Sequence, residues 1–81
     1  MTKLLDTGKK KAFCARLARV EGQLRGVQRL VDTDADCEDI AQQLSAARKA
    51  LDKSFFNMVA CMIEQGDLPH AKVAALLAKF A

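Results

Sequence analysis

Two long segments of this chain carry apolar residues at alternating steps of three and four, and this spacing constrains the fold more than any other feature. In the first segment, about 9–31, the apolar positions are Phe13, Leu17, Val20, Leu24, Val27 and Val31. In the second, about 36–65, they are Ile40, Leu44, Ala47, Leu51, Phe55, Met58 and Met62. Such heptad seams are typical of helices that pack lengthwise. The sequence therefore predicts two long antiparallel helices.

A third, shorter helix is predicted over about 69–80. Gly66 is suited to end the second helix, and the stretch Asp67-Leu-Pro69 then starts the third with proline in its first turn. Between the two long helices lies an acidic loop, 32–36, rich in residues that cap helices. Gly22 and Gly26 indicate a close backbone approach to the first helix. The expected fold is one all-α domain spanning 1–81.

Self-association is expected because the apolar surface exceeds what so short a chain can cover. The chain has 81 residues, of which 51% are hydrophobic. The run 55–63, FFNMVACMI, is apolar nearly all round a helix, and such a helix must be covered on several sides. A two-helix hairpin leaves part of it exposed, so we expect a dimer or a larger bundle.

Charge is distributed unevenly along the chain. Residues 8–31 carry seven basic side chains and one acidic, a formal charge of +6, whereas residues 32–39 carry five acidic side chains and no basic one. A basic helix beside an acidic loop favours duplex DNA as a partner, although a merely solvated helix face remains the alternative. The candidate DNA contacts are Arg16, Arg19, Lys49 and Lys53. Helix-turn-helix and zinc-finger spacings are missing, so DNA binding would have to use the exposed basic faces of a bundle.

Composition excludes several classes of protein. The basic stretch 1–11 has no apolar run behind it, so we expect no signal peptide, and no stretch approaches the ~20 apolar residues of a membrane span. Three cysteines do not pair evenly, which favours reduced thiols in the cytoplasm. A glycine-rich phosphate loop and a histidine beside a cysteine are both missing, so we expect no enzyme.

Three segments resemble the CsoR/RcnR/FrmR family of bacterial repressors. They are RLARVEGQLRGVQR at 16–29, DCEDI at 36–40 and QLSAARKAL at 43–51. The resemblance implies an all-helical dimer that pairs into a tetramer, an operator-binding repressor released by an inducer at a cysteine between subunits. It also implies that Arg16 and Lys53 contribute to DNA binding.

The chain departs from the family at the sensor site. The family's copper sensors place a histidine 25 residues after the first cysteine, here Cys37, and a cysteine four residues beyond that; these positions hold Met62 and Gly66. Nickel, cobalt and formaldehyde sensors also need histidine, and His70 is the one histidine of the chain. Persulfide sensors pair the first cysteine with one at the position of Gly66. Cys61 lies one residue before the family's histidine position.

Cys37 and Cys61 are the candidate sensing thiols. Cys37 begins the second long helix, where a helix N-terminus favours the thiolate while neighbouring acids oppose it. The pair, contributed by neighbouring subunits, would react with reactive sulfur or an oxidant, or bind Cu(I), which soft thiolates suit. We expect reactive sulfur first and Cu(I) second, with no cofactor otherwise required. Met62 is a third soft ligand or a core residue.

Two residues have no part in this hypothesis, and one alternative class of function stays open. Cys14 packs beside the seam and His70 lies on the surface, each without an expected role. The alternative from another class is that the chain is a small helical metal-binding or interaction protein without a DNA role. Steep salt dependence of DNA binding separates that alternative from a repressor.

Overall fold

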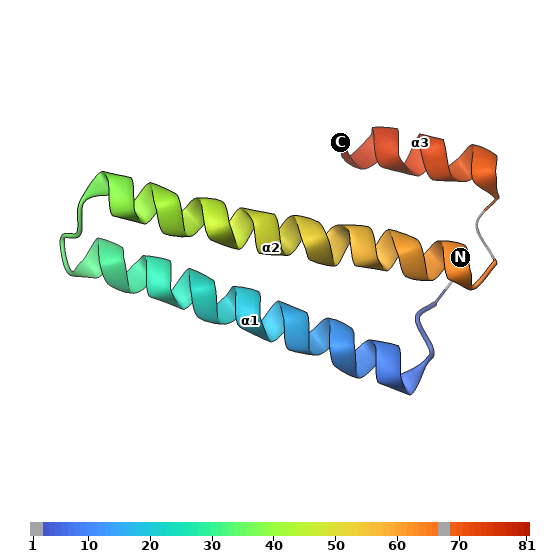
Figure 1. The fold of residues 1–81 in the computed structure, drawn as a ribbon, viewed down its shortest axis with the longest axis horizontal. Coiled ribbons are helices and arrows are strands. Elements are labelled where there is room, and N and C mark those ends of the chain that lie inside the picture. Colours follow the sequence, from blue (N-terminus) through green and yellow to red (C-terminus); the bar gives the residue numbers. More distant parts are fainter. Residues whose placement is uncertain (1–2, 67–68) are drawn as a thin grey trace.

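Three α-helices make up the fold of this computed structural model, which describes residues 3–66 and 69–81. They are α1 (Thr7–Asp32), α2 (Cys37–Glu64) and α3 (His70–Phe80). Helices α1 and α2 form a long antiparallel hairpin, and α3 folds back along the side of α2 that faces away from α1 (Figure 1). The predicted all-α, three-helix architecture is confirmed, and each helix end lies within two residues of its expected position.

Side-chain and backbone hydrogen bonds fix the ends of the helices. The Asp6 carboxylate accepts a hydrogen bond from the Lys9 backbone N–H at 2.9 Å and caps α1. At the other end of α1, the Thr33 hydroxyl donates to the Arg29 carbonyl at 2.8 Å. Gly66 follows α2 with a φ of 74°, and its N–H donates to the Ile63 carbonyl at 3.0 Å, as expected for a C-terminal glycine.

Two expectations about helix starts are revised. Asp36 occupies the N-cap position of α2, yet its side chain makes no capping hydrogen bond. Pro69 is the N-cap residue of α3 and not part of its first turn. Asp67 and Leu68, which were expected to lead into α3, lie outside the described residues.

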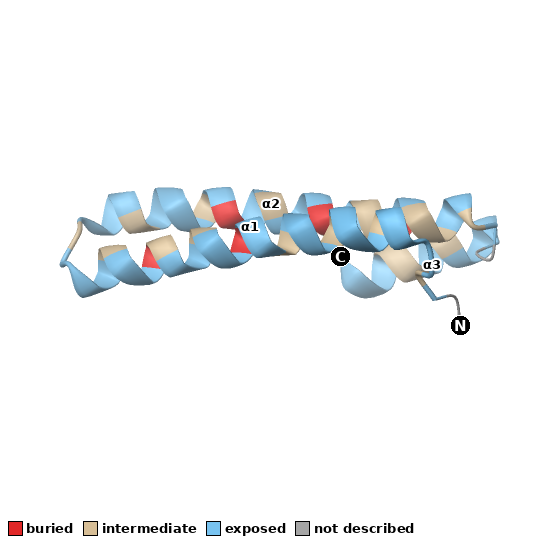
Figure 2. Ribbon diagram, turned by 90° about the horizontal axis from the view of Figure 1, so that it is seen from below, coloured by how far each residue is buried: buried red, intermediate tan, exposed pale blue. Residues whose placement is uncertain are grey.

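The core is thin and lies between α1 and α2. The buried residues are Val20 and Val27 of α1 and Ala47, Ser54 and Val59 of α2 (Figure 2). Small side chains at Ala47 and Ser54 let the two helices approach each other. The molecule measures 48 × 28 × 14 Å. Because it is so long and thin, much of its apolar surface is uncovered.

Part of the predicted seam does not face the other helix of the hairpin. The exposed fractions are 44% for Leu24, 54% for Val31, 49% for Leu44 and 51% for Leu51. The reason is that Ile40, Ala47 and Ser54, which share one heptad position, face α1. Leu44 and Leu51 lie on the neighbouring stripe of α2, which α1 does not cover.

The two glycines of α1 do not mark a close approach within the described chain, and an approach by another subunit stays a prediction. A Cβ atom added to Gly22 or Gly26 would meet no atom within 4 Å. Gly22 lies about 200° around the helix from the buried Val20, so it faces away from α2.

Helix α3 covers the apolar run 55–63 only in part. The Phe55 ring contacts Phe80 of α3 edge-on, with centroids 6.0 Å apart. Phe56 and Phe80 nevertheless remain 59% and 57% exposed. None of the described helices combines the length and the hydropathy needed to cross a membrane.

Candidate DNA-binding groove and sensing thiols

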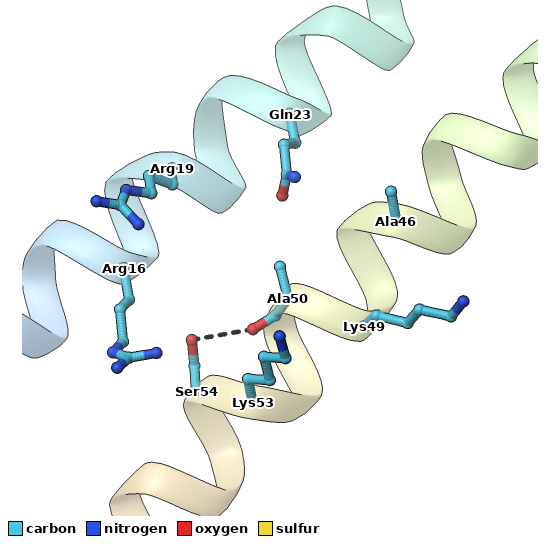
Figure 3. Close-up of a pocket in the computed structure, with 8 residues that line it drawn as sticks. All are labelled: Arg16, Arg19, Gln23, Ala46, Lys49, Ala50, Lys53 and Ser54. Atoms are coloured by element: carbon cyan, nitrogen blue, oxygen red, sulfur yellow. Dashed lines mark hydrogen bonds between the residues drawn. The ribbon is translucent and has the colours of Figure 1, made fainter.

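A cationic groove runs between α1 and α2 on one side of the hairpin (Figure 3). It has a volume of about 420 Å³, and its lining residues are Arg16, Arg19, Gln23, Ala46, Lys49, Ala50, Lys53 and Ser54. All four basic residues that the sequence singled out line this one groove, and no acidic residue lines it. Such a concentration of positive charge attracts phosphate groups.

Helical spacing places these side chains. Arg16, Arg19 and Gln23 follow one another at steps of three and four and so share one face of α1. On α2, Ala46 and Ala50 are short, which opens the groove between the two rows. Figure 3 shows Arg16 and Gln23 reaching toward α2, while Arg19 and Lys49 extend outward from the two rims.

Two polar residues at the floor of the groove were not foreseen from the sequence. Ser54 is only 2% exposed, and its hydroxyl donates to the Ala50 carbonyl at 3.2 Å. The Oε1 atom of Gln23 is buried without a hydrogen-bond partner in the structure. The sequence did contain a signal for Gln23. This polar residue lies on the core side of α1 between Val20 and Val27 and interrupts the apolar pattern there.

The candidate thiols lie far apart in one chain. Cys37 is the exposed first residue of α2, and Cys61 is half-buried near the other end of the same helix. Their separation of 24 residues corresponds to about 36 Å along the helix axis. The structure therefore brings neither thiol to the other within one chain.

The two thiols also lie on different faces of α2. Cys37 shares its heptad position with Leu44 and Leu51, which α1 leaves exposed, and with the half-buried Met58. Cys61 shares its heptad position with Ile40, Ala47 and Ser54, the stripe that faces α1. Around the helix the two cysteines are about 120° apart.

A salt bridge lies beside Cys61 at the open end of the hairpin. The Lys9 Nζ atom donates a hydrogen bond to Glu64 Oε2 at 2.8 Å. This hydrogen bond and the attraction of the Glu64 carboxylate raise the pKa of Lys9 above its ordinary value, and Cys61 and Asp6 add to the increase.

Residues 3–66 and 69–81 hold no cluster of three or more His, Cys, Asp or Glu side chains that would bind a metal within one chain. Cys14 was expected to pack beside the seam but is exposed on α1, and His70 is exposed at the start of α3. A metal site on this protein would therefore need donors from more than one subunit, or donors of another type.

Comparison with known proteins identifies the family. The family model described as metal-sensitive transcriptional repressor matches residues 9–76, most of the chain. No solved structure matches the chain significantly.

Curated relatives carry copper in their names. The chain is 40% identical over 53 residues to the copper-sensing transcriptional repressor RicR of Mycobacterium tuberculosis, covering 65% of this chain and 55% of that protein. It is 40% identical over 48 residues to the copper-sensing transcriptional repressor CsoR of the same organism, covering 59% of this chain and 40% of that protein. It is 50% identical over 36 residues to CsoR of Bacillus subtilis, covering 44% of this chain and 36% of that protein.

The matched part spans between 36% and 55% of the length of these relatives. With its three-helix fold and the match over 9–76, the chain belongs to the family of metal-sensitive transcriptional repressors.

Proposed function

We propose that this protein is a transcriptional repressor that binds duplex DNA through the cationic groove and releases it when Cu(I) binds at Cys37. The observation that carries the DNA part is the convergence of Arg16, Arg19, Lys49 and Lys53 on one groove. The sequence alone placed reactive sulfur ahead of Cu(I) as inducer; the relatives, which are copper-sensing repressors, favour Cu(I).

The groove suits the phosphate backbone of DNA and not the base edges. Its basic residues lie on the faces of two long helices lying side by side, and they belong to the middle of each helix and not to a helix end. Contacts of this type position a protein on a duplex and make its affinity depend on salt. An oligomer would present several copies of the groove along the duplex, and their positive charges would together strengthen binding.

A dimer of dimers is the proposed assembly. Leu24, Leu44 and Leu51 line an apolar groove on the other side of the hairpin from the cationic one, together with Val20, Ala47 and Arg48. A second apolar surface includes Phe56, Ile63 and Phe80, each at least 43% exposed. Two separate surfaces of this kind suit two kinds of subunit contact, and burying them would stabilise the oligomer.

The donor atoms of the chain fit Cu(I). The exposed Cys37 supplies a soft thiolate, and soft sulfur donors select Cu(I) over hard cations. Cys61 was the partner expected from the sequence, and from a neighbouring subunit it remains a candidate for the second ligand. Cys37 would hold Cu(I), which would supply a positive charge at the start of α2.

Coupling between the two sites is proposed to run through α2. Cys37 is the first residue of this helix, and Lys49 and Lys53 lie farther along it. Fixing Cys37 to a neighbouring subunit would shift α2 relative to that subunit and change the spacing of the grooves. An inducer releases DNA only if it binds the two states unequally.

Comparing the two inducers tests the proposal. Genomic duplexes selected on the metal-free protein and then sequenced provide the DNA probe, and fluorescence anisotropy measures its release. We expect one equivalent of Cu(I) per subunit to release the duplex, and polysulfide to leave it bound. Release by polysulfide alone, with mass spectrometry showing sulfur added to Cys37, would restore reactive sulfur as the inducer.

A further inference from the structure

We propose that the floor of the cationic groove binds a small ligand, a sugar or polyol that carries two phosphate groups, and that Gln23 recognises one of its hydroxyl groups. This site goes beyond the proposed function, because the ligand would bind whether or not DNA does. Its effect on DNA rests on the proposed function, since ligand and duplex would compete for the same basic side chains.

A buried acceptor at the floor of the groove points to this ligand. The Oε1 atom of Gln23 is buried and has no hydrogen-bond partner in the described part of the chain. Figure 3 shows this oxygen aimed across the groove toward α2. Ser54, on the opposite wall, does not supply a donor, because its hydroxyl already donates to the Ala50 carbonyl at 3.2 Å. Buried polar atoms are rarely left unpaired, so the donor comes from outside the chain.

Duplex DNA does not supply this donor. Phosphodiester oxygens only accept hydrogen bonds, and the base edges that carry donors lie inside the grooves of the duplex. The axes of two packed helices are about 8–10 Å apart, whereas the major groove alone is about 12 Å wide. A duplex therefore rests on the rims, from which Arg19 and Lys49 extend, and its bases stay away from Gln23. Only a small molecule reaches the floor.

Volume and charge define the class of this molecule. The groove has a volume of about 420 Å³, within the range of small-molecule sites. Two phosphate groups carry a charge of about −3 to −4 near neutral pH, which matches the four basic side chains of the groove. None of the described lining residues is aromatic, so a nucleobase would find no ring to stack on. A hydroxylated carbon chain between two phosphates supplies both the anions and the donor.

Two bisphosphates, one with hydroxyl groups and one without, test the site. Mannitol and hexanediol, each phosphorylated at both ends, have the same carbon chain and the same charge. Isothermal titration calorimetry at fixed salt measures the affinity of the metal-free, DNA-free protein for each. We expect the mannitol bisphosphate to bind about fivefold more tightly, the size of one hydrogen bond. Equal affinities would overturn the inference and leave solvent to hydrate Gln23.

Matched variants locate the contact. Q23L removes the acceptor and should bind the two bisphosphates equally, whereas Q28L, at an exposed glutamine of α1 outside the cationic groove, should keep the fivefold preference. K53A should weaken the binding of both probes more than K72A, which removes a charge on α3. A preference that survives in Q23L, or equal weakening in K53A and K72A, would overturn the site.

Competition with DNA separates this inference from the proposed function. In C37S without Cu(I), the mannitol bisphosphate should displace the selected duplex at lower concentration than the hexanediol bisphosphate, as measured by anisotropy. If the protein binds the duplex but does not distinguish the two bisphosphates, this inference fails and the proposed function stands. If calorimetry shows the preference but the protein binds no duplex, the ligand site stands and the proposed function fails.

Discussion

The Lys9 ammonium donates a 2.8 Å hydrogen bond to Glu64 and so joins the first turn of α1 to the last residue of α2. The two residues are 55 positions apart in sequence. They close the end of the hairpin opposite the loop that connects the two helices (Figure 1). The side chains are 39% and 63% exposed, so solvent and salt screen their attraction.

Replacing Glu64 by Gln should destabilise the hairpin slightly, and more at low salt than at high salt. Because the hydrogen bond raises the pKa of Lys9, the stabilisation is present at neutral pH and is lost as pH rises above the raised pKa. Urea unfolding at fixed protein concentration measures the change. E21Q removes a carboxylate without breaking an ion pair, and an equal decrease in stability in that variant would contradict a specific role for Lys9–Glu64.

Enlarging Ala47 should strain the packing of α1 on α2. Ala47 is 3% exposed and Val20, on α1, is 5% exposed. The added volume in A47L should lower the free energy of unfolding by about 1–3 kcal/mol. In A60L, where the alanine is exposed, the same substitution should change stability little. Urea midpoints for the two variants make the comparison, and equal midpoints would place the helix contact elsewhere.

Introducing a charge at Leu51 should disrupt the proposed dimer. Leu51 is 51% exposed in the single chain and would become buried between two copies, where an unpaired carboxylate is costly. Light scattering at micromolar concentration should show a shift of L51E toward the monomer mass of 8.9 kDa. L5E, at a leucine that is 70% exposed outside the helices, should keep the parent's mass. An unchanged mass for L51E would exclude this face as the interface.

Removing Arg16 should weaken DNA binding and reduce its dependence on salt. If Arg16 neutralises one phosphate, R16A should lower the slope of log affinity against log salt by about 0.9, the value for one phosphate of duplex DNA. K72A removes one positive charge on α3, outside the cationic groove, and should leave the slope unchanged. Equal slopes for R16A and the parent would move the DNA interface away from the groove.

The helices and their ends were predictable because their signals are local. Heptad spacing marks the two long helices, and Gly66, with its φ of 74°, ends α2 where a residue without a Cβ is favoured. The cationic residues could be named in advance from the positive charge of the sequence and from the resemblance to the repressor family, which implies roles for Arg16 and Lys53. That all four residues line one groove could be seen only in the structure, because it depends on how α1 packs on α2.

The choice of the packing face could not be predicted from one sequence. The expected seam of α2 joined Leu44 and Leu51 with Ile40 and Ala47. Ala47 of that seam is buried, together with Ser54, because small residues allow closer helix packing, whereas Leu44 and Leu51 remain exposed. The expectation that Cys61 meets the thiol of another subunit depended on the same choice of face. It stays a prediction.

Copper-dependent weakening of DNA binding tests the central claim most directly. The dissociation constant for the selected duplex is measured by anisotropy at fixed salt, without Cu(I) and with one equivalent per subunit, for the parent and C37S. We predict that Cu(I) weakens DNA binding of the parent by about 5- to 150-fold, the usual range of coupling between sites, and leaves C37S unchanged. An unchanged dissociation constant for the parent, or equal weakening in C37S, would contradict Cu(I) sensing at Cys37.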